Sequence, residues 1–126
     1  MQQQLLALAR DITPETVLDA LRVHVGAANG ITAAQLAHAI TDRFDKCDER
    51  RLRTCVEQLR MEGHEICAHP SDGYYIAANA AELEHCCTFL VERALTSLRQ
   101  VAQLKRCALP DLYGQLGLPT TTGERQ

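Results

Sequence analysis

The sequence predicts a mainly α-helical protein with one small β-hairpin, an α+β fold, on three observations. Apolar residues recur at helical spacing in two neighbouring segments, 33–40 and 48–62. The turn-forming run Pro70-Ser71-Asp72-Gly73 then separates two short strand-like segments. After the hairpin, no Gly or Pro occurs from residue 74 to residue 109, which favours one long helix. This order of elements predicts a winged helix-turn-helix followed by a long C-terminal helix.

Two threonines mark the starts of the first helices. Thr13 precedes Pro14, and a Thr N-cap with Pro in the first turn is a strong helix start. The expected buried face of this first helix is Val17, Leu18, Leu21 and Val25. Thr32 is the expected N-cap of a second helix, Ala33 to Ile40. Its expected buried face is Leu36, Ala37 and Ile40.

A third helix is expected from an N-cap at Asp48 to about Glu62, just before the helix-stopping Gly63. Its predicted buried face is Leu52, Cys55, Val56 and Leu59. The loop before it, residues 41–47, is polar except for Phe44, which is expected to fill the core between the helices.

The long helix is expected to begin after an N-cap at Asn79 and to end near Arg106, about 40 Å away at 1.5 Å per residue. Its apolar surface exceeds what a small winged domain can cover, so we expect it to form a homodimer. The predicted dimerisation residues are Leu90, Leu95, Leu98 and Val101. The predicted segments are an N-terminal arm (1–12), the winged helix-turn-helix domain (13–78), the dimerisation helix (79–107), and a short helix with a flexible tail (108–126).

A set of residues across this region also suggests a family. Leu59, Arg60 and Gly63 end a helix that leads into Ile66-Cys67. Gly73-Tyr74-Tyr75 follows, and then a long helix with the pair Arg93-Ala94. Over about residues 30–100 this pattern resembles a group of small bacteriophage and prophage winged helix-turn-helix proteins. The resemblance implies the fold and a phage-type origin, with the cytoplasm of a bacterial host as the expected location.

The composition is that of an ordinary globular protein, with 46% hydrophobic and 23% charged residues. No basic segment followed by an apolar run opens the sequence, and no apolar stretch approaches membrane-spanning length. We therefore expect a cytoplasmic protein with no membrane partner. Cys55 and Cys67 occupy apolar positions, and Cys86 and Cys87 are adjacent, so the six cysteines predict reduced thiols instead of a disulfide framework.

The net charge of -3 argues against a protein that coats nucleic acid through bulk charge. Residues 43–60 nevertheless carry six basic against four acidic side chains. Arg pairs with guanine, Gln pairs with adenine, and both reach phosphates. The first hypothesis is therefore a protein that binds double-stranded DNA to regulate transcription or assist replication. The candidate DNA-binding residues are Arg43, Lys46, Arg50, Arg51, Arg53, Thr54 and Gln58. The alternative is a solvated helix face on which Arg53 and Glu57 pair at i,i+4.

The expected hairpin is a weaker signal for DNA. Its tip has no Lys or Arg, and Asp72 would repel a phosphate. Tyr74 and Tyr75 point to opposite faces of a strand, so one is expected in the core while the other can offer its hydroxyl to a phosphate. The favoured interpretation of this segment is an ordinary structural hairpin that does not contact DNA. The absence of basic residues from the tip and the acidic balance of the chain favour a second hypothesis. In it the protein is an adaptor, or a phage-encoded inhibitor of a host or defence factor, with a host protein as its partner.

Metal and catalytic chemistry have little support in the sequence. His64, Cys67 and His69 have the spacing of one arm of a zinc site, but structural zinc usually takes paired ligands from two arms. We predict no metal and no cofactor. The sequence has no glycine-rich phosphate loop and no activated-serine motif, and no Cys with an identifiable His partner. We therefore predict that the protein is not an enzyme.

Overall fold

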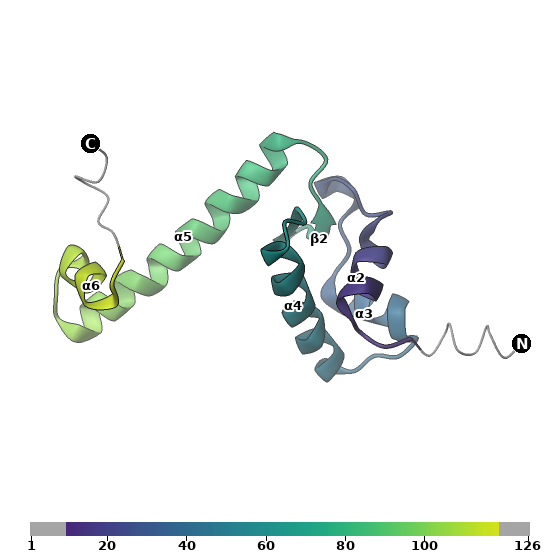
Figure 1. Cartoon of the computed structure of the whole chain (residues 1–126), viewed down its shortest axis with the longest axis horizontal. Coiled ribbons are helices and arrows are strands. Elements are labelled where there is room, and N and C mark those ends of the chain that lie inside the picture. The colour runs from purple at the N-terminus through teal and green to yellow at the C-terminus, as the bar shows by residue number, and fades with distance from the viewer. Residues whose placement is uncertain (1–9, 119–126) are drawn as a thin grey trace, which may run out of the picture. The chain divides into compact units, whose positions relative to one another are not determined.

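The computed structural model describes residues 10–118, and within them it contains five α-helices and one two-stranded antiparallel sheet (Figure 1). The helices are α2 (Pro14–Leu21), α3 (Ala33–Thr41), α4 (Lys46–Met61), α5 (Ala80–Lys105) and α6 (Leu109–Leu116), with a 3-10 helix, η1 (Ala27–Asn29). The strands are β1 (Ile66–His69) and β2 (Gly73–Ile76). The predicted mainly α fold with one β-hairpin is confirmed. Most of the predicted N-terminal arm and the last eight residues of the predicted tail lie outside the described residues.

The chain divides into two compact units, one ending at Cys86 and the other beginning at Cys87. The first unit contains α2, α3, α4, the hairpin and the first turns of α5. The second contains the rest of α5 together with α6.

Threonine caps begin α2 and α3 as predicted. The hydroxyl of Thr13 accepts a hydrogen bond from the backbone N–H of Thr16 at 3.2 Å, and the hydroxyl of Thr16 accepts one from the N–H of Thr13 at 2.9 Å. This reciprocal pair is a capping box, and Pro14 follows it in the first turn. At the start of α3 the Thr32 hydroxyl accepts a hydrogen bond from the N–H of Gln35 at 3.2 Å. Local sequence chemistry is thus sufficient to start both helices.

The N-cap of α4 is Asp45, so the predicted cap at Asp48 is wrong. The Asp45 side chain accepts a hydrogen bond from the N–H of Cys47 at 2.9 Å. Asp48 instead lies in the first turn of the helix with its side chain only 1% exposed. The guanidinium of Arg43 provides the donors for its carboxylate, which lets Asp48 sit inside the helix instead of capping it. The other end agrees with the prediction, since α4 stops at Met61 before Gly63, whose φ is 99°.

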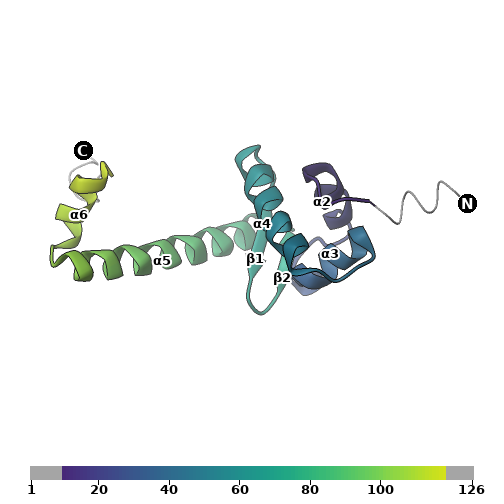
Figure 2. The same cartoon turned by 90° about the horizontal axis from the view of Figure 1, so that it is seen from below.

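Helices α2, α3 and α4 pack around one hydrophobic core (Figure 2). From α4, Leu52, Val56 and Leu59 are each at most 2% exposed. The other helices add buried aliphatic side chains, namely Val17 and Leu21 from α2 and Leu36, Ala37 and Ile40 from α3. The helical register predicted for α4 is therefore confirmed, and it leaves the opposite face of that helix in solvent.

Two predicted core residues lie outside it. Val25 is 42% exposed, because α2 ends at Leu21 and Val25 belongs to a short bridge with Ile76 instead of to the helix. Phe44 is 72% exposed. The loop before α4 turns Arg43 toward Asp48, while the Phe44 ring stacks on His38 with ring centroids 4.1 Å apart. Phe44 therefore covers the surface of α3 and does not fill the core.

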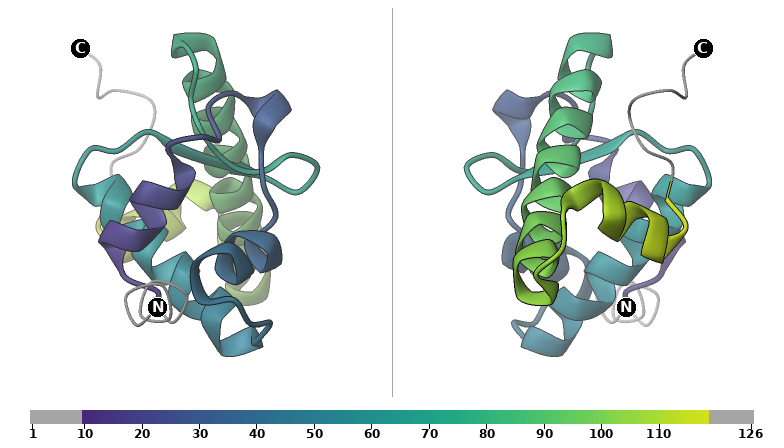
Figure 3. Two further views of the ribbon diagram at one scale, coloured as in Figure 1. Left: turned by 90° about the vertical axis from the view of Figure 1, so that its right-hand side faces the viewer. Right: turned by 90° about the vertical axis from the view of Figure 1, so that its left-hand side faces the viewer.

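The hairpin is anchored to the chain segment between α2 and α3. Its two strands pair in the register Ile66 with Ile76 and His69 with Gly73. On the other edge of β2, Ile31 and Tyr74 exchange two backbone hydrogen bonds of 2.9 and 2.7 Å. Figure 3 shows the turn of the hairpin projecting beyond the helices of this unit. The strand β2 is thus paired on both edges, which fixes the hairpin against the helical core.

A second, smaller core lies beneath the hairpin. It consists of Cys67, Tyr75 and Cys86, none more than 4% exposed. Burial raises the pKa of Tyr75 to about 12, so its hydroxyl stays protonated. Tyr75 is the core tyrosine and Tyr74 is only half-buried, as the alternation along the strand predicted.

The start of α5 is tied to this core by Asn79 and Glu82. The predicted N-cap Asn79 accepts a hydrogen bond from the N–H of Glu82 at 2.9 Å. The carboxylate of Glu82 accepts two further backbone N–H groups, from Ala78 at 2.9 Å and from Ala27 at 3.1 Å. These bonds hold the pKa of Glu82 below its usual value. The first turn of α5 is therefore attached to η1, 55 residues away in the sequence.

In the second unit α6 folds back beside the end of α5 (Figure 1). Ala102 of α5 is 7% exposed and Leu112 of α6 is fully buried. A hydrogen bond of 3.0 Å from the Lys105 Nζ to the Gln115 Oε1 joins the two helices. The core of this helical hairpin is thus far smaller than that of the first unit.

Candidate nucleic-acid interface

The predicted DNA-binding residues of α4 lie on its solvent side. Lys46, Arg50, Arg53, Thr54 and Gln58 are all exposed, and we refer to them as the α4 face. Residues 46, 50 and 53 are spaced by four and three, so their side chains form one stripe along the helix. Glu57 continues that stripe four residues beyond Arg53.

The cations of the α4 face have no carboxylate partners among residues 10–118. Lys46, Arg50 and Arg53 form no ion pair there, and the Arg53–Glu57 pair considered from the sequence is absent from this part of the chain. The polar members bond within their own helix. The Thr54 hydroxyl donates to the Arg50 carbonyl at 3.3 Å, and the Gln58 Nε2 donates to the Glu62 Oε2 at 3.2 Å. The three cations are therefore available to an anionic partner.

Arg43 and Arg51 are instead engaged with Asp48. The Arg43 guanidinium donates from Nε to Oδ2 at 2.8 Å and from Nη2 to Oδ1 at 2.9 Å. The Arg51 Nη1 lies 3.8 Å from the Asp48 Oδ1 and 3.6 Å from the Asp11 Oδ1. The Arg43 hydrogen bonds hold the pKa of Asp48 below its usual value, although burial acts in the opposite direction. In this structure both arginines join α4 to neighbouring segments, and their role as DNA contacts stays a prediction.

Asp48→Asn should lower the free energy of unfolding by about 1–3 kcal/mol at neutral pH, because it removes a buried carboxylate from a bidentate pair. The folded-state pKa of Asp48 is lowered, so its stabilisation is present above the unfolded pKa of about 4 and is lost as the pH falls through the folded pKa. Denaturant unfolding across the acid range should therefore show the two proteins converging below about pH 4. Asp42→Asn is the matched control, since Asp42 is 64% exposed. Equal stability of Asp48→Asn and the unmutated protein at pH 7 would contradict this account.

Arg60 and Tyr74 connect helix α4 to the hairpin, and the sequence analysis did not link these two residues. The Arg60 Nε donates to the carbonyl of Ile66 in β1 at 2.8 Å, and the Arg60 Nη2 is enclosed without a hydrogen-bond partner among the described residues. Burial raises the pKa of the Tyr74 hydroxyl, while the nearby charges of Arg60 and Arg53 act to lower it. The charges of Arg60, Arg53 and Glu57 therefore all act on the Tyr74 hydroxyl. Their distance in sequence hides this, although the spacing of seven between Arg53 and Arg60 already places both on one side of α4.

The structure shows where the side chains lie that have zinc-like spacing in the sequence, those of His64, Cys67 and His69. Among residues 10–118, no three His, Cys, Asp or Glu side chains are grouped as metal ligands. Cys67 is fully buried, and burial raises its pKa to about 12, with Cys86 beside it contributing. His64 is exposed. The spacing of these residues in the sequence therefore does not bring them together as a ligand set.

Comparison with protein-family models, with curated proteins and with solved structures finds no match for this chain. The resemblance to phage winged-helix proteins remains an expectation that rests on the sequence pattern between residues 59 and 94. Within the described part of the chain, no helix combines the length and the apolar character needed to span a bilayer.

Proposed function

We propose that the chain is a winged helix-turn-helix protein that binds double-stranded DNA through the α4 face. Helices α3 and α4 follow one another across a loop of four residues, and the hairpin comes directly after α4. This is the order in which winged-helix proteins present a recognition helix and a wing. The observation that carries the proposal is the stripe of Lys46, Arg50 and Arg53, exposed and unpaired among the described residues on a helix whose other face is fully buried.

Four residues of the α4 face have a chemical role in this proposal. Arg50 and Arg53 reach guanine edges or phosphates, Gln58 reaches adenine, and Lys46 holds a backbone phosphate at the start of the helix. Glu57 on the same stripe repels phosphate, so it suits a position facing a cytosine amino group. Tyr74, in the strand β2, donates its hydroxyl to a phosphate beside the groove.

Removing two cations from the stripe should weaken DNA binding in a salt-dependent way. We expect the double variant Arg50→Ala/Arg53→Ala to bind duplex DNA at least about 10-fold more weakly at low salt. Each phosphate contact that it removes should reduce the slope of log affinity against log salt by about one. Fluorescence anisotropy with a pool of random duplexes at several salt concentrations measures both quantities. The matched control is the double variant Arg10→Ala/Arg22→Ala, which removes two exposed cations outside the α4 face.

The outcome also decides between two classes of function. Equal loss of affinity in the control would assign binding to net charge and not to the α4 face. If the unmutated protein bound no duplex even at low salt, the proposal would fail. A protein-binding adaptor would then be favoured, because Met61 at the end of α4 is 88% exposed and the hairpin tip has no Lys or Arg. If the protein binds DNA, we propose that it is a small regulator of bacteriophage type.

A further inference from the structure

Helix α5 has an apolar stripe that α6 does not cover, and we refer to it as the seam. The seam residues are separated alternately by three and four positions, as in a coiled coil. They are Cys87, Leu90, Ala94, Ser97, Val101 and Leu104. Leu90 is 41% exposed and Leu104 is 83% exposed. Large apolar side chains aligned along one helix face are uncommon on the surface of a monomer.

The side of α5 that packs on α6 is a different one. Leu95, Leu98 and Ala102 form a second stripe about a quarter-turn around the helix from the seam. Ala102 in that stripe is buried, as is Leu112 of α6. Of the four predicted dimerisation residues, Leu90 and Val101 therefore belong to the seam, Leu98 lies at its edge, and Leu95 lies on the stripe that contains Ala102.

We propose that two copies of this chain pair in antiparallel orientation along the seam. In the proposed register Leu90 of one copy lies opposite Val101 of the other, Ala94 opposite Ser97, and Cys87 opposite Leu104. All three pairs follow from one two-fold axis crossing the helices between residues 95 and 96, so the stripe is complementary to itself. The small side chains Ala94 and Ser97 meet next to the axis, where they allow the helices to approach closely.

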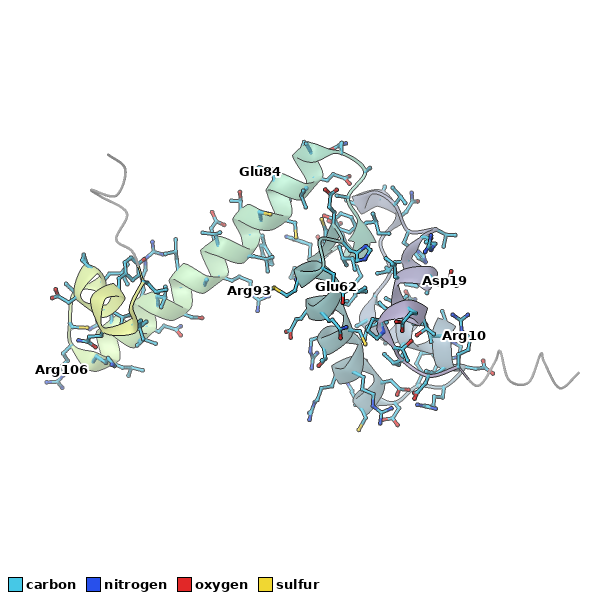
Figure 4. The ribbon with its side chains drawn as sticks, in the orientation of Figure 1. Arg10, Asp19, Glu62, Glu84, Arg93 and Arg106 are labelled. Atoms are coloured by element: carbon cyan, nitrogen blue, oxygen red, sulfur yellow. The ribbon has the colours of Figure 1, made fainter. Side chains whose placement is uncertain are left out.

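The charges of α5 select the antiparallel direction. Its acidic residues, Glu82, Glu84 and Glu92, lie in the first half, and its basic residues, Arg93, Arg99 and Lys105, lie in the second half. Figure 4 shows Glu84 near the first turns, Arg93 farther along and Arg106 just past the end. In the proposed register the residues bordering the seam pair Glu84 with Lys105 and Val91 with Leu98. Parallel pairing would instead place Arg93 beside Leu98 and Gln100 beside Lys105, with no opposite charges in contact.

A second copy also suits the small size of the second unit. Among its described residues only Ala102 and Leu112 are buried apolar side chains. Helical hairpins of this size rarely bury enough surface to be stable without a partner or another support. Pairing along the seam would cover Leu90, Val91 and Leu104 in both chains. The assembly is independent of DNA binding and is tested without DNA.

Sedimentation equilibrium of the full chain tests the pairing. We expect a concentration-dependent dimer whose dissociation constant rises about 100-fold or more in Leu104→Glu, since two buried leucines are lost from each dimer. Gln103→Glu adds the same charge at an exposed position facing away from the seam and should leave the dissociation constant unchanged. A monomer at every concentration for the unmutated chain, or equal weakening by both variants, would overturn the proposal.

Thiol cross-linking tests the direction. The starting chain has Cys47 and Cys107 replaced by Ser, which leaves Cys87 as its exposed thiol. Diamide takes up two hydrogens as two thiols become a disulfide. It should link Leu104→Cys chains between Cys87 of one copy and the new thiol at position 104 of the other, as peptide mass spectrometry can establish. The starting chain and Gln103→Cys should not form this link. A Cys87–Cys87 link in the starting chain would overturn the antiparallel arrangement.

Discussion

Leu59→Ala lowers the free energy of unfolding of the first unit by about 2–5 kcal/mol, the expected effect of removing a buried leucine side chain. Leu59 is 2% exposed and lies in the core shared by α2, α3 and α4. The substitution loses the burial of three carbons and leaves a cavity that a close-packed core fills only in part. Because α4 also presents the candidate DNA-binding residues, the loss should be accompanied by weaker DNA binding near the midpoint of unfolding.

Met61→Ala is the matched control in the same helix. Met61 is 88% exposed, so its truncation should change the stability by no more than about 0.5 kcal/mol. Urea unfolding followed by circular dichroism measures both variants. If the two variants lost similar amounts of stability, the register of α4 on the core would be wrong, and the face assigned to DNA would be wrong with it.

Most of the fold could be predicted because its signals are local. A threonine before Pro14 starts α2, and the alternation around Tyr74 and Tyr75 identifies the strand β2. The spacing of Leu52, Val56 and Leu59 gives the buried face of α4. Each of these signals acts within a few residues, over which backbone geometry fixes where the side chains point. The exposure of Arg50 and Arg53 follows from the same geometry.

The predictions for the N-cap of α4 and for Phe44 were wrong because in each case the residue type is compatible with two different positions in the fold. Asp45 and Asp48 are both good N-caps by residue type. The choice between them depends on Arg43, whose guanidinium reaches Asp48 across the loop. Phe44 has the large apolar side chain that is typical of a core residue, but the loop before α4 places its ring on His38. Residue type alone does not decide either case, because the deciding partner lies five or six residues away in the sequence and its position depends on the path of the loop before α4.

Contacts between residues far apart in the sequence, or between a helix and the hairpin, could not be predicted either. The Glu82 carboxylate accepts the N–H of Ala27, and Arg60 donates to Ile66 while lying near Tyr74. Nothing in the spacing of these residues predicts such contacts, since they depend on how the hairpin packs against the helices. The electrostatic link between the α4 face and Tyr74 therefore had to come from the structure.

Gly73→Ala should lower the free energy of unfolding by about 2–6 kcal/mol, because the hairpin lies in close contact with the segment at Ile31. Two effects contribute to the loss. Gly73 has a φ of 78°, where a side chain strains the backbone by about 1–3 kcal/mol. An added Cβ would also press into the carbonyl of Ile31 and lie 3.0 Å from the Thr32 N. Overpacking of this kind adds about 1–3 kcal/mol, because backbone atoms cannot move aside as a flexible side chain does.

Gly63→Ala separates the two effects. Gly63 has a φ of 99°, but a Cβ there would meet no atom within 4 Å. It should therefore show the backbone strain alone, and Gly73→Ala should be less stable than Gly63→Ala by about 1–3 kcal/mol in urea unfolding. Gly73→Ala should also break the hydrogen bonds between Ile31 and Tyr74, which backbone hydrogen exchange at these residues can detect. Equal stability of the two variants, with exchange at Tyr74 unchanged, would mean that the hairpin is not held against the Ile31 segment. Tyr74 would then have no fixed position from which to reach a phosphate beside the α4 face.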